Sequence, residues 1–362
     1  MRLSLKRRKE SPPPAPVAPR RRAPEPPANL PEYEPVVSAD PLAELAELMA
    51  ANRAAPDPAR EKRIVQLRHE AFAELDRGQT PPWPPERSGA ELPQPAGLPE
   101  IDAADLSADA LRDGILGGGS LLIRGLVDSD RAERMRAGID STFELRDALM
   151  QGTDVAETTP WFDPFAPRPD YPPDAAQWNR MKLGGHAVWA PDSPRMMFEL
   201  LDAFDETGLT RVVTEYLGER PALSMNKSVL RRVSPESGTD WHQDGAFLGE
   251  GIRTCNVWIA LSRCGDVAPG LDIVARRYEE IVETGTEGAV FPWAVSPQMV
   301  EQTREGAEIA RPVFEAGDAL LFDHNCLHRT AVDPAMTEDR YATETWCFAP
   351  SVYPDETVPL VL

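Results

Sequence analysis

The spacing of apolar residues predicts helices in the first part of the chain. Apolar side chains recur three or four residues apart within 41–54 and 59–77, an interval that places them on one face of a helix. Gly78 stands where the second of these helices is expected to end, and His69, among charged residues, is expected to be exposed. The same spacing predicts further helices over residues 107–116, 129–149 and 194–217.

Beyond residue 220 the dominant period changes to two, which is typical of strands. Along 254–261 one set of alternate residues is wholly apolar, whereas the other includes Asn256 and Trp258. The first set is expected to pack against helices and the second to line a small-molecule cavity. Turns rich in Gly, Pro and Asp separate the predicted strands, which lie at 120–123, 222–233, 254–261, 289–293, 310–314, 319–322 and 342–349. This pattern predicts a mainly β fold with flanking α-helices, its core at about 220–350 being an antiparallel barrel or jelly roll.

Proline content separates the N-terminal part from this core. The chain has 362 residues and 38 prolines, of which 20 lie in the first 100 residues. Residues 1–40 hold too few apolar side chains to offset the entropy of ordering, so we expect a disordered Pro/Arg-rich leader, with docking to an acidic partner as the alternative. Residues 41–99 are expected to form a helical and Pro-rich extension, followed by a single domain at 100–355.

Charge and cysteine content narrow the class of protein. A formal net charge of −21 disfavours nucleic acid and anionic membranes as partners, because both would be repelled. No apolar run approaches the roughly 18–20 residues of a membrane span, and no apolar segment follows the basic start of the chain, so a cytoplasmic protein is expected. The four cysteines form no C-x-x-C pair and are expected to be buried free thiols of a reducing compartment: Cys255, Cys264, Cys326 and Cys347.

The sharpest chemical feature is a His-x-Asp motif, His242 and Asp244. Residues two apart in a strand point to the same side, so an imidazole and a carboxylate would be presented together. A third ligand from a distant strand would complete the two-histidine, one-carboxylate set that suits non-haem Fe(II) with open coordination positions. His328 and His324 both follow the apolar strand 319–322, and the spacing from that strand favours His328 as the third ligand.

Arg340 lies twelve residues after His328 and opens another predicted strand. The open positions of such a metal would admit a chelating dicarboxylate, whose far carboxylate requires a cation. Arginine suits this role because its guanidinium pairs bidentately with a carboxylate and stays charged when partly buried. A plain surface arginine is the alternative.

The combination resembles the phytanoyl-CoA dioxygenase family of Fe(II)- and 2-oxoglutarate-dependent oxygenases. The resemblance extends over about 100–350. Its matching segments are Leu122 to Leu126, Trp241 to Gly245, Asn256 to Leu261, Pro269 to Leu271, and Gly317-Asp318 with Phe322, His328 and Arg340. It implies a double-stranded β-helix (jelly roll, cupin-like) flanked by N-terminal helices, and a dioxygenase that uses Fe(II), 2-oxoglutarate and dioxygen, with ascorbate as a supporting reductant.

The same resemblance implies roles for individual residues. His242, Asp244 and His328 match the iron ligands, which would be the catalytic centre. Arg340 matches the residue that binds the far carboxylate of 2-oxoglutarate. Thr330 matches a hydroxyl that assists Arg340, and Met225 a residue that touches the co-substrate, while Asn256 and Trp258 are candidate co-substrate contacts from the cavity-lining set.

The chain departs from the family pattern after Gly270-Leu271. The family usually continues into a Pro-Gly-Ser-His turn, whereas this chain continues Asp272-Ile273-Val274. The resemblance therefore does not extend to an acyl-CoA substrate, and only a small organic substrate is expected. Halogenating relatives lack the carboxylate of Asp244, so its presence favours hydroxylation, with desaturation or ring chemistry left open.

Other hypotheses stay open at this point. The chain is alternatively a non-catalytic jelly-roll binding module that has kept its metal ligands, or a cupin-type metalloenzyme that does not use 2-oxoglutarate. His186 is expected in a loop. Trp178, Arg180 and Trp189 are candidates for the substrate pocket, although core packing of the two tryptophans is an equal alternative.

Overall fold

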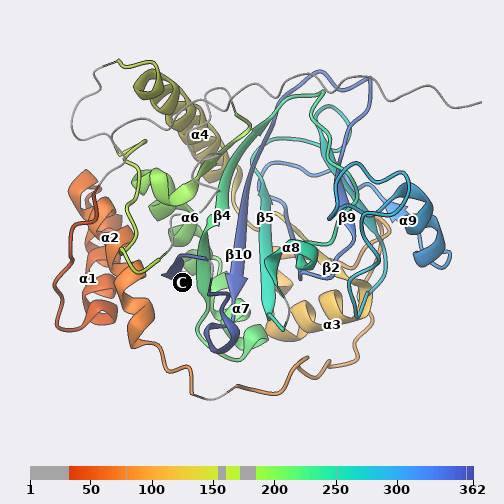
Figure 1. The fold of residues 1–362 in the computed structure, drawn as a ribbon, viewed down its shortest axis with the longest axis horizontal. Coiled ribbons are helices and arrows are strands. Elements are labelled where there is room, and N and C mark those ends of the chain that lie inside the picture. The colour runs from red at the N-terminus through yellow and green to blue at the C-terminus, as the bar shows by residue number, and fades with distance from the viewer. Residues whose placement is uncertain (1–31, 79, 154–159, 172–184, 250, 356) are drawn as a thin grey trace, which may run out of the picture.

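The computed structural model describes residues 32–78, 80–153, 160–171, 185–249, 251–355 and 357–362, and its core is built from two facing sheets (Figure 1). Among these residues, eight strands form the larger sheet, in the order β1-β2-β8-β5-β10-β4-β11, with β3 paired to β4. The smaller sheet has the order β7-β6-β9. The strands of the larger sheet are β1 (Glu100–Asp102), β2 (Ser120–Arg124), β3 (Ala187–Trp189), β4 (Ala222–Val233), β5 (Thr254–Ala260), β8 (Ala319–Phe322), β10 (Arg340–Phe348) and β11 (Pro359–Val361). Those of the smaller sheet are β6 (Gly270–Val274), β7 (Ile309–Ala310) and β9 (His328–Ala331). The predicted mainly β jelly-roll core with flanking helices is confirmed.

Helices cover one face of the larger sheet. Helix α3 packs on β2, α4 on β4 and β10, and α7 on β5, while α6 bridges α4, α7 and α2. Capping explains several of their ends, since the side chains of Ser107 and Asp128 each accept a backbone hydrogen bond at a helix start, and Gly119 and Gly218 end helices with positive φ. The helices are α1 (Pro41–Ala54), α2 (Pro58–Glu70), α3 (Ala108–Gly118), α4 (Ser129–Met150), α6 (Pro194–Glu206), α7 (Leu209–Leu217), α8 (Gly245–Leu248) and α9 (Pro297–Thr303).

The two sides of β5 behave as its alternation predicts. Cys255, Val257 and Ile259 belong to the largest apolar cluster, which lies between the larger sheet and the helices. Asn256 and Trp258 point the other way and line a cavity between the two sheets. All four cysteines are free and buried, as expected.

Several predicted elements differ from the observed ones. No strand forms at 289–293, where Ala294 N–H closes a turn on the carbonyl of Phe291. The strand predicted at 310–314 is reduced to β7, because Pro312 has no N–H for the ladder, although Phe314 still forms an isolated bridge with Cys264.

The predicted helix boundaries also required correction. The helix expected over 194–217 is two helices, divided at Gly208, whose φ is 73°. The helix expected over 59–77 ends at Glu70 and continues only as a 3-10 turn (Ala71–Glu74), so Gly78 is not its end.

His69 is buried, contrary to expectation. The ring accepts a hydrogen bond from the N–H of Arg168 at 3.2 Å, and its other nitrogen bonds the carbonyl of Pro359 at 2.9 Å. The helix α2 packs on β11, so the charged neighbours of His69 in the sequence did not indicate the surface.

The expected leader lies mostly outside the described residues, and residues 32–40 form no helix or strand. In the described part of the chain, no helix combines the length and the apolar character needed to cross a membrane.

Candidate active site

The His-x-Asp pair and one histidine that is distant from it in sequence meet where the smaller sheet begins at His328. His242 and His328 face each other in an isolated antiparallel bridge, with backbone hydrogen bonds of 2.9 and 3.0 Å in the two directions. Asp244 follows at the start of α8. One ligand atom from each of the three residues lies within 4.8 Å of the others, so the predicted ligands are brought together.

The segment that carries the first two ligands is clamped by the residue between them. Gln243 is fully buried, donates to the carbonyl of Asn325 at 2.7 Å, and accepts from the N–H of Val282 at 2.6 Å. A Cβ at Gly245 would lie 2.5 Å from Ile281 Cδ1, so glycine allows α8 to begin directly after Asp244. The sequence prediction did not include Gln243, although a polar residue between two ligands was the available signal. The strand expected for this segment is not formed, because His242 makes only an isolated bridge and Asp244 already has helical dihedral angles at the start of α8.

The hydrogen bonds of the two imidazoles orient the nitrogens that remain. His242 Nδ1 lies 2.7 Å from the carbonyl of Asp240, and His328 Nδ1 lies 3.1 Å from that of Cys326. A carbonyl only accepts, so both Nδ1 atoms carry the proton and both Nε2 atoms keep a free lone pair. Burial and the neighbouring His242 lower the pKa of His328, against the opposing charge of Asp244, which favours the neutral ring that metals bind.

Arg340 is buried at the other end of the cavity. Its guanidinium donates to the carbonyl of Gly270 at 3.3 Å and lies 5.7 Å from the ring of Trp258, and its Nε has no hydrogen-bond partner in the part of the chain that the structure describes. Burial lowers the pKa of Arg340 to about 10, which still leaves it charged at neutral pH. Thr330 also lines the cavity there. The arginine is thus a charged donor inside the cavity and not a surface residue.

Asn256 and Trp258 line the same cavity, but Met225 does not. The Asn256 side-chain oxygen is buried and has no hydrogen-bond partner among the residues that the structure describes. Met225 belongs instead to the apolar cluster under the helices. The reason is an irregularity in the pairing of β4 with β10. Leu223 pairs with Cys347 and Ser228 with Thr345, so β4 has an odd number of extra residues between these two pairs. An odd number of extra residues makes the side chains of β4 exchange faces.

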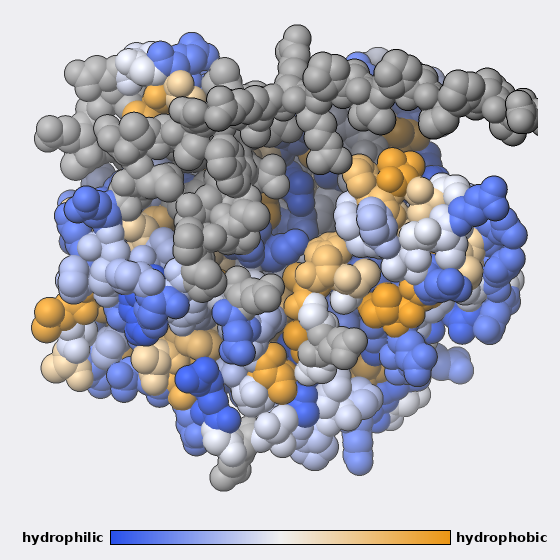
Figure 2. Space-filling model, in the orientation of Figure 1, coloured by the Kyte–Doolittle hydropathy of each residue, from blue (hydrophilic) through white to orange (hydrophobic). Residues whose placement is uncertain are grey.

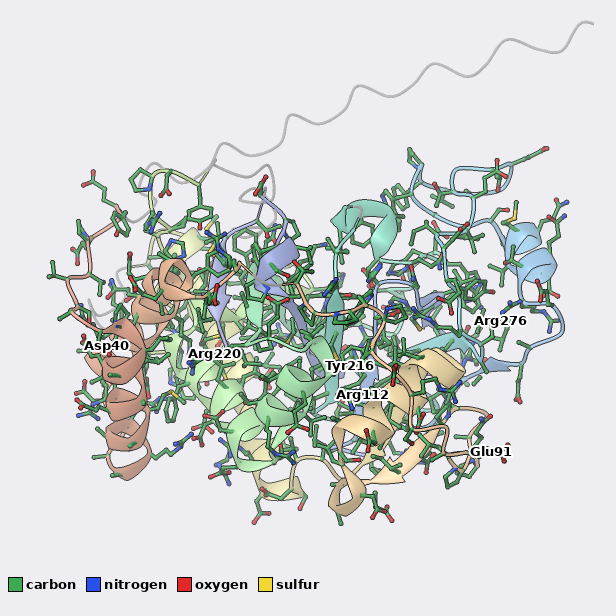
Figure 3. The ribbon with its side chains drawn as sticks, turned by 90° about the horizontal axis from the view of Figure 1, so that it is seen from below. Asp40, Glu91, Arg112, Tyr216, Arg220 and Arg276 are labelled. Atoms are coloured by element: carbon green, nitrogen blue, oxygen red, sulfur yellow. The ribbon has the colours of Figure 1, made fainter. Side chains whose placement is uncertain are left out.

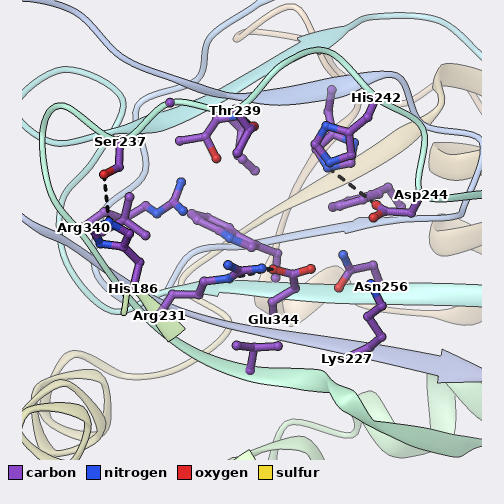
Figure 4. Close-up of a pocket in the computed structure, with 18 of the residues that line it drawn as sticks. His186, Lys227, Arg231, Ser237, Thr239, His242, Asp244, Asn256, Arg340 and Glu344 are labelled. Carbon is purple, nitrogen blue, oxygen red and sulfur yellow. Dashed lines mark hydrogen bonds and ion pairs between the residues drawn. The ribbon is translucent and has the colours of Figure 1, made fainter. Parts of the chain in front are cut away.

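The exchange puts two cations into the cavity that the sequence prediction missed. Lys227 and Arg231 line it, and Arg231 donates from two nitrogens to one carboxylate oxygen of Glu344, at 3.0 and 2.7 Å. Burial opposes the ionisation of Glu344, but the charge and hydrogen bonds of Arg231 and the charge of Lys227 outweigh it and lower the pKa of Glu344 to about 2. Glu344 is therefore a carboxylate, and Figure 4 shows it between the ligand cluster and Arg231.

The remaining candidates do not belong to the three-ligand cluster. His324 bonds the hydroxyl of Thr254 at 2.9 Å and is not part of the three-ligand group. His186 is in a loop at the cavity edge, 3.1 Å from the hydroxyl of Ser237 (Figure 4). Trp189 packs in the apolar cluster under the helices. Trp178 and Arg180 lie outside the described residues.

The cavity has a volume of about 290 Å³, near the lower end of typical small-molecule sites. The His-Asp-His cluster occupies one part of it, Arg340 and Thr330 a second, and the Lys227–Arg231–Glu344 wall a third. Such an arrangement can hold a divalent metal, a chelating dicarboxylate and a further small molecule together.

Comparison with known proteins agrees with this geometry. A profile of the Phytanoyl-CoA dioxygenase (PhyH) family matches residues 117–332, more than half of the chain. No curated protein matches the sequence.

A search of solved structures matches, among others, three proteins of low sequence identity. The non-heme alpha-ketoglutarate dependent carbocyclase SnoK from nogalamycin biosynthesis is 14% identical (TM-score 0.44, covering 69% of this chain and 86% of that one). AviO1 from Streptomyces viridochromogenes Tue57 is 15% identical (TM-score 0.43, covering 69% and 97%). EctD from S. alaskensis, solved with 2-oxoglutarate and 5-hydroxyectoine, is 14% identical (TM-score 0.46, covering 75% and 83%).

Proposed function

The chain belongs to the phytanoyl-CoA dioxygenase family, and from that premise we propose that it is an Fe(II)- and 2-oxoglutarate-dependent dioxygenase that hydroxylates a small organic substrate. The observation that carries the proposal is the convergence of His242, Asp244 and His328 within 4.8 Å, in one cavity with a buried arginine. Two imidazoles and one carboxylate are the ligand set of non-haem Fe(II) sites that keep open positions.

The residues fit the metal. Both imidazoles direct a free Nε2 lone pair away from their backbone anchors, and His328 Nε2 lies 3.7 Å from the carboxylate of Asp244. Because the three donors come from short, hydrogen-bonded segments, they need little rearrangement to bind an ion. The ring of Phe322, 4.8 Å from that of His328, would shield this side of the metal from water.

The residues also fit 2-oxoglutarate. Arg340 offers a buried charge whose Nε has no hydrogen-bond partner among the described residues, and Thr330 adds a hydroxyl to the lining of the same cavity. A carboxylate bound beside the buried guanidinium would stabilise its charge, because the ion pair replaces the hydration that both groups lose on burial. Trp258 would form the apolar wall along the chain of the co-substrate, since its ring faces the guanidinium.

The protein's contribution to the reaction is positioning. Bound Fe(II) and 2-oxoglutarate together supply the activation of dioxygen that oxidises a substrate C–H bond. Gln243 and the backbone bridge hold the ligands in place, Arg340 fixes the co-substrate, and the cavity walls exclude water. With iron bound, Asp244 would take the coordination position that halogenation requires for a halide, so we propose hydroxylation.

The test is succinate formation from 2-oxoglutarate with added Fe(II) and ascorbate. We expect turnover by the wild-type protein and a loss of about a thousandfold or more in His242→Ala, since the metal site is destroyed. His324→Asn is the matched control, because that histidine lies outside the ligand cluster and should leave iron stoichiometry unchanged. Full succinate production by His242→Ala would refute the assignment. Iron binding without 2-oxoglutarate turnover would instead favour a cupin-type enzyme or a binding module.

A further inference from the structure

A part of the cavity remains that neither the metal nor the co-substrate explains. It is the wall formed by Lys227, Arg231 and Glu344, on the adjacent strands β4 and β10. Arg231 and Glu344 neutralise each other through their two hydrogen bonds. Lys227 makes no ion pair with any residue that the structure describes.

Lys227 nevertheless lies near the ligand cluster. Its Nζ is 4.4 Å from the centroid of the Phe247 ring, which in turn is 6.2 Å from the ring of His242. Its charge also contributes to the lowered pKa of Glu344. The ammonium group is therefore close enough to contact a molecule that reacts beside the metal.

The charges of the cavity give the preferred charge of that molecule. Fe(II) with Asp244 carries one net positive charge, and with Arg340 this balances the two negative charges of 2-oxoglutarate. Arg231 balances Glu344, so the positive charge of Lys227 is left over. In a partly desolvated cavity an unbalanced cation favours an anionic ligand over a neutral or cationic one.

An apolar surface continues outward from the same point. Phe247 is 40% exposed and Phe291 48% exposed, and Trp293 joins them, stacked on Phe291 at 5.1 Å and edge-on to Phe247 at 5.8 Å. Trp293 also meets the ring of His242 at 5.6 Å, so the aromatic surface begins at the ligand cluster. Figure 2 shows apolar residues exposed on this face of the molecule. Exposed aromatic groups beside a cavity suit the apolar body of a ligand.

We infer that the substrate is a small monoanion, with a carboxylate or similar group held by Lys227 and an apolar body that rests on Phe247, Trp293 and Phe291. The inference rests on the proposed function, because the charge balance assumes bound Fe(II) and 2-oxoglutarate. It narrows the class of substrate expected for that site. The apolar portion of the substrate would lie toward the metal ligands, and its negative charge would lie at Lys227, apart from Arg340.

The test measures binding and does not require turnover. Protein loaded anaerobically with Fe(II) and 2-oxoglutarate is titrated by calorimetry with three matched acid and amide pairs: benzoate and benzamide, hydrocinnamate and hydrocinnamamide, and octanoate and octanamide. We expect at least one acid to bind about 10- to 100-fold more tightly than its amide, the range of a charge-assisted hydrogen bond. Lys227→Met should abolish that preference, and Lys227→Arg, the matched control, should retain it.

The outcomes separate the two proposals. A wild-type protein that fails to bind 2-oxoglutarate contradicts the proposed function itself. If 2-oxoglutarate binds but the acids bind no better than the amides, or do not bind, only the substrate inference is overturned. A preference that survives in Lys227→Met overturns it as well. Weakened 2-oxoglutarate binding in Lys227→Met would also overturn it, because the lysine would then serve the co-substrate.

Discussion

The two faces of the larger sheet are made from the same strands but serve different needs. On β10, Thr343, Thr345 and Cys347 face the helices, whereas Arg340 and Glu344 face the cavity. These three helix-facing side chains are small and completely buried, so they stabilise the fold through packing. The cavity side holds charges whose desolvation is costly, which indicates that ligands complete it. Alternate residues of one strand should therefore respond differently to substitution.

Substitution on the helix side should reduce stability and leave the site intact. Ile259 is fully buried in the apolar cluster, so Ile259→Ala should lower the free energy of unfolding by about 3 kcal/mol, through lost burial and a residual cavity. The measurement is chemical denaturation followed by circular dichroism. Ile259→Val, which removes a single methylene, should cost about 1 kcal/mol. A large loss of 2-oxoglutarate affinity in the folded fraction of Ile259→Ala would show that the two faces are not independent.

Substitution on the cavity side should show the reverse pattern. Arg340→Met should weaken 2-oxoglutarate binding about 10- to 100-fold, or roughly 2 kcal/mol, because a charge-assisted pair is lost. The unfolding free energy should not fall, since it is unfavourable to bury a guanidinium that makes no ion pair with the described residues and whose Nε has no hydrogen-bond partner among them. Calorimetric titration of 2-oxoglutarate measures the first effect and denaturation the second. Arg340→Lys should recover part of the affinity, and equal affinity in Arg340→Met would exclude this residue as the co-substrate ligand.

The smallest expected effect is a pH dependence of stability that arises from His69 on α2, a helix away from the cavity. Burial lowers the pKa of His69, while its hydrogen bond to the Pro359 carbonyl opposes the shift. The unfolded chain therefore binds a proton at His69 more readily than the folded protein does. The stability that comes from burying the neutral ring is complete above 6.5, the ordinary pKa of histidine, and is lost as the pH falls toward the lower pKa of the folded state. The loss per group cannot exceed about 1.4 kcal/mol per pH unit.

His69→Gln removes this titration and keeps groups that can donate and accept. The slope of unfolding free energy between pH 7 and pH 5 should be smaller than in the wild type, and the remainder should persist because burial also lowers the pKa of His324. An unchanged slope in His69→Gln would show that the protonated ring is accommodated in the folded protein.

The sequence predicted the site better where local periodicity decides the outcome. The alternation along 254–261 correctly separated Val257 from Trp258, and the His-x-Asp motif with His328 identified the three side chains that meet. The roles of these ligands and of Arg340 stay predictions. Periodicity failed where long-range contacts dominate: His69 is buried by β11, and the aromatic residues at 289–293 form a turn beside the cavity instead of a strand.

Met225 and Lys227 show why the cavity wall was only partly predictable. Strict alternation along 222–233 places both residues on one face, but the register irregularity divides them. No residue within that segment marks the change, because the irregularity is defined only by the partner strand β10. Glu344 and Arg231 were also missed, and their contact across the two strands depends on the same register of β4 and β10.

The length of this irregular segment constrains how the chain can change over evolution. Between Leu223 and Ser228, a deletion or insertion of a single residue would change the number of extra residues in β4, relative to β10, from odd to even. If the pairs before this segment kept their register, the side chains after it would exchange faces. Leu230 and Arg232 would then point into the cavity, and Arg231 would point toward the helices. Homologues that keep this cavity should therefore show insertions or deletions between Leu223 and Ser228 only of an even number of residues. Insertions or deletions of a single residue should be confined to the loops.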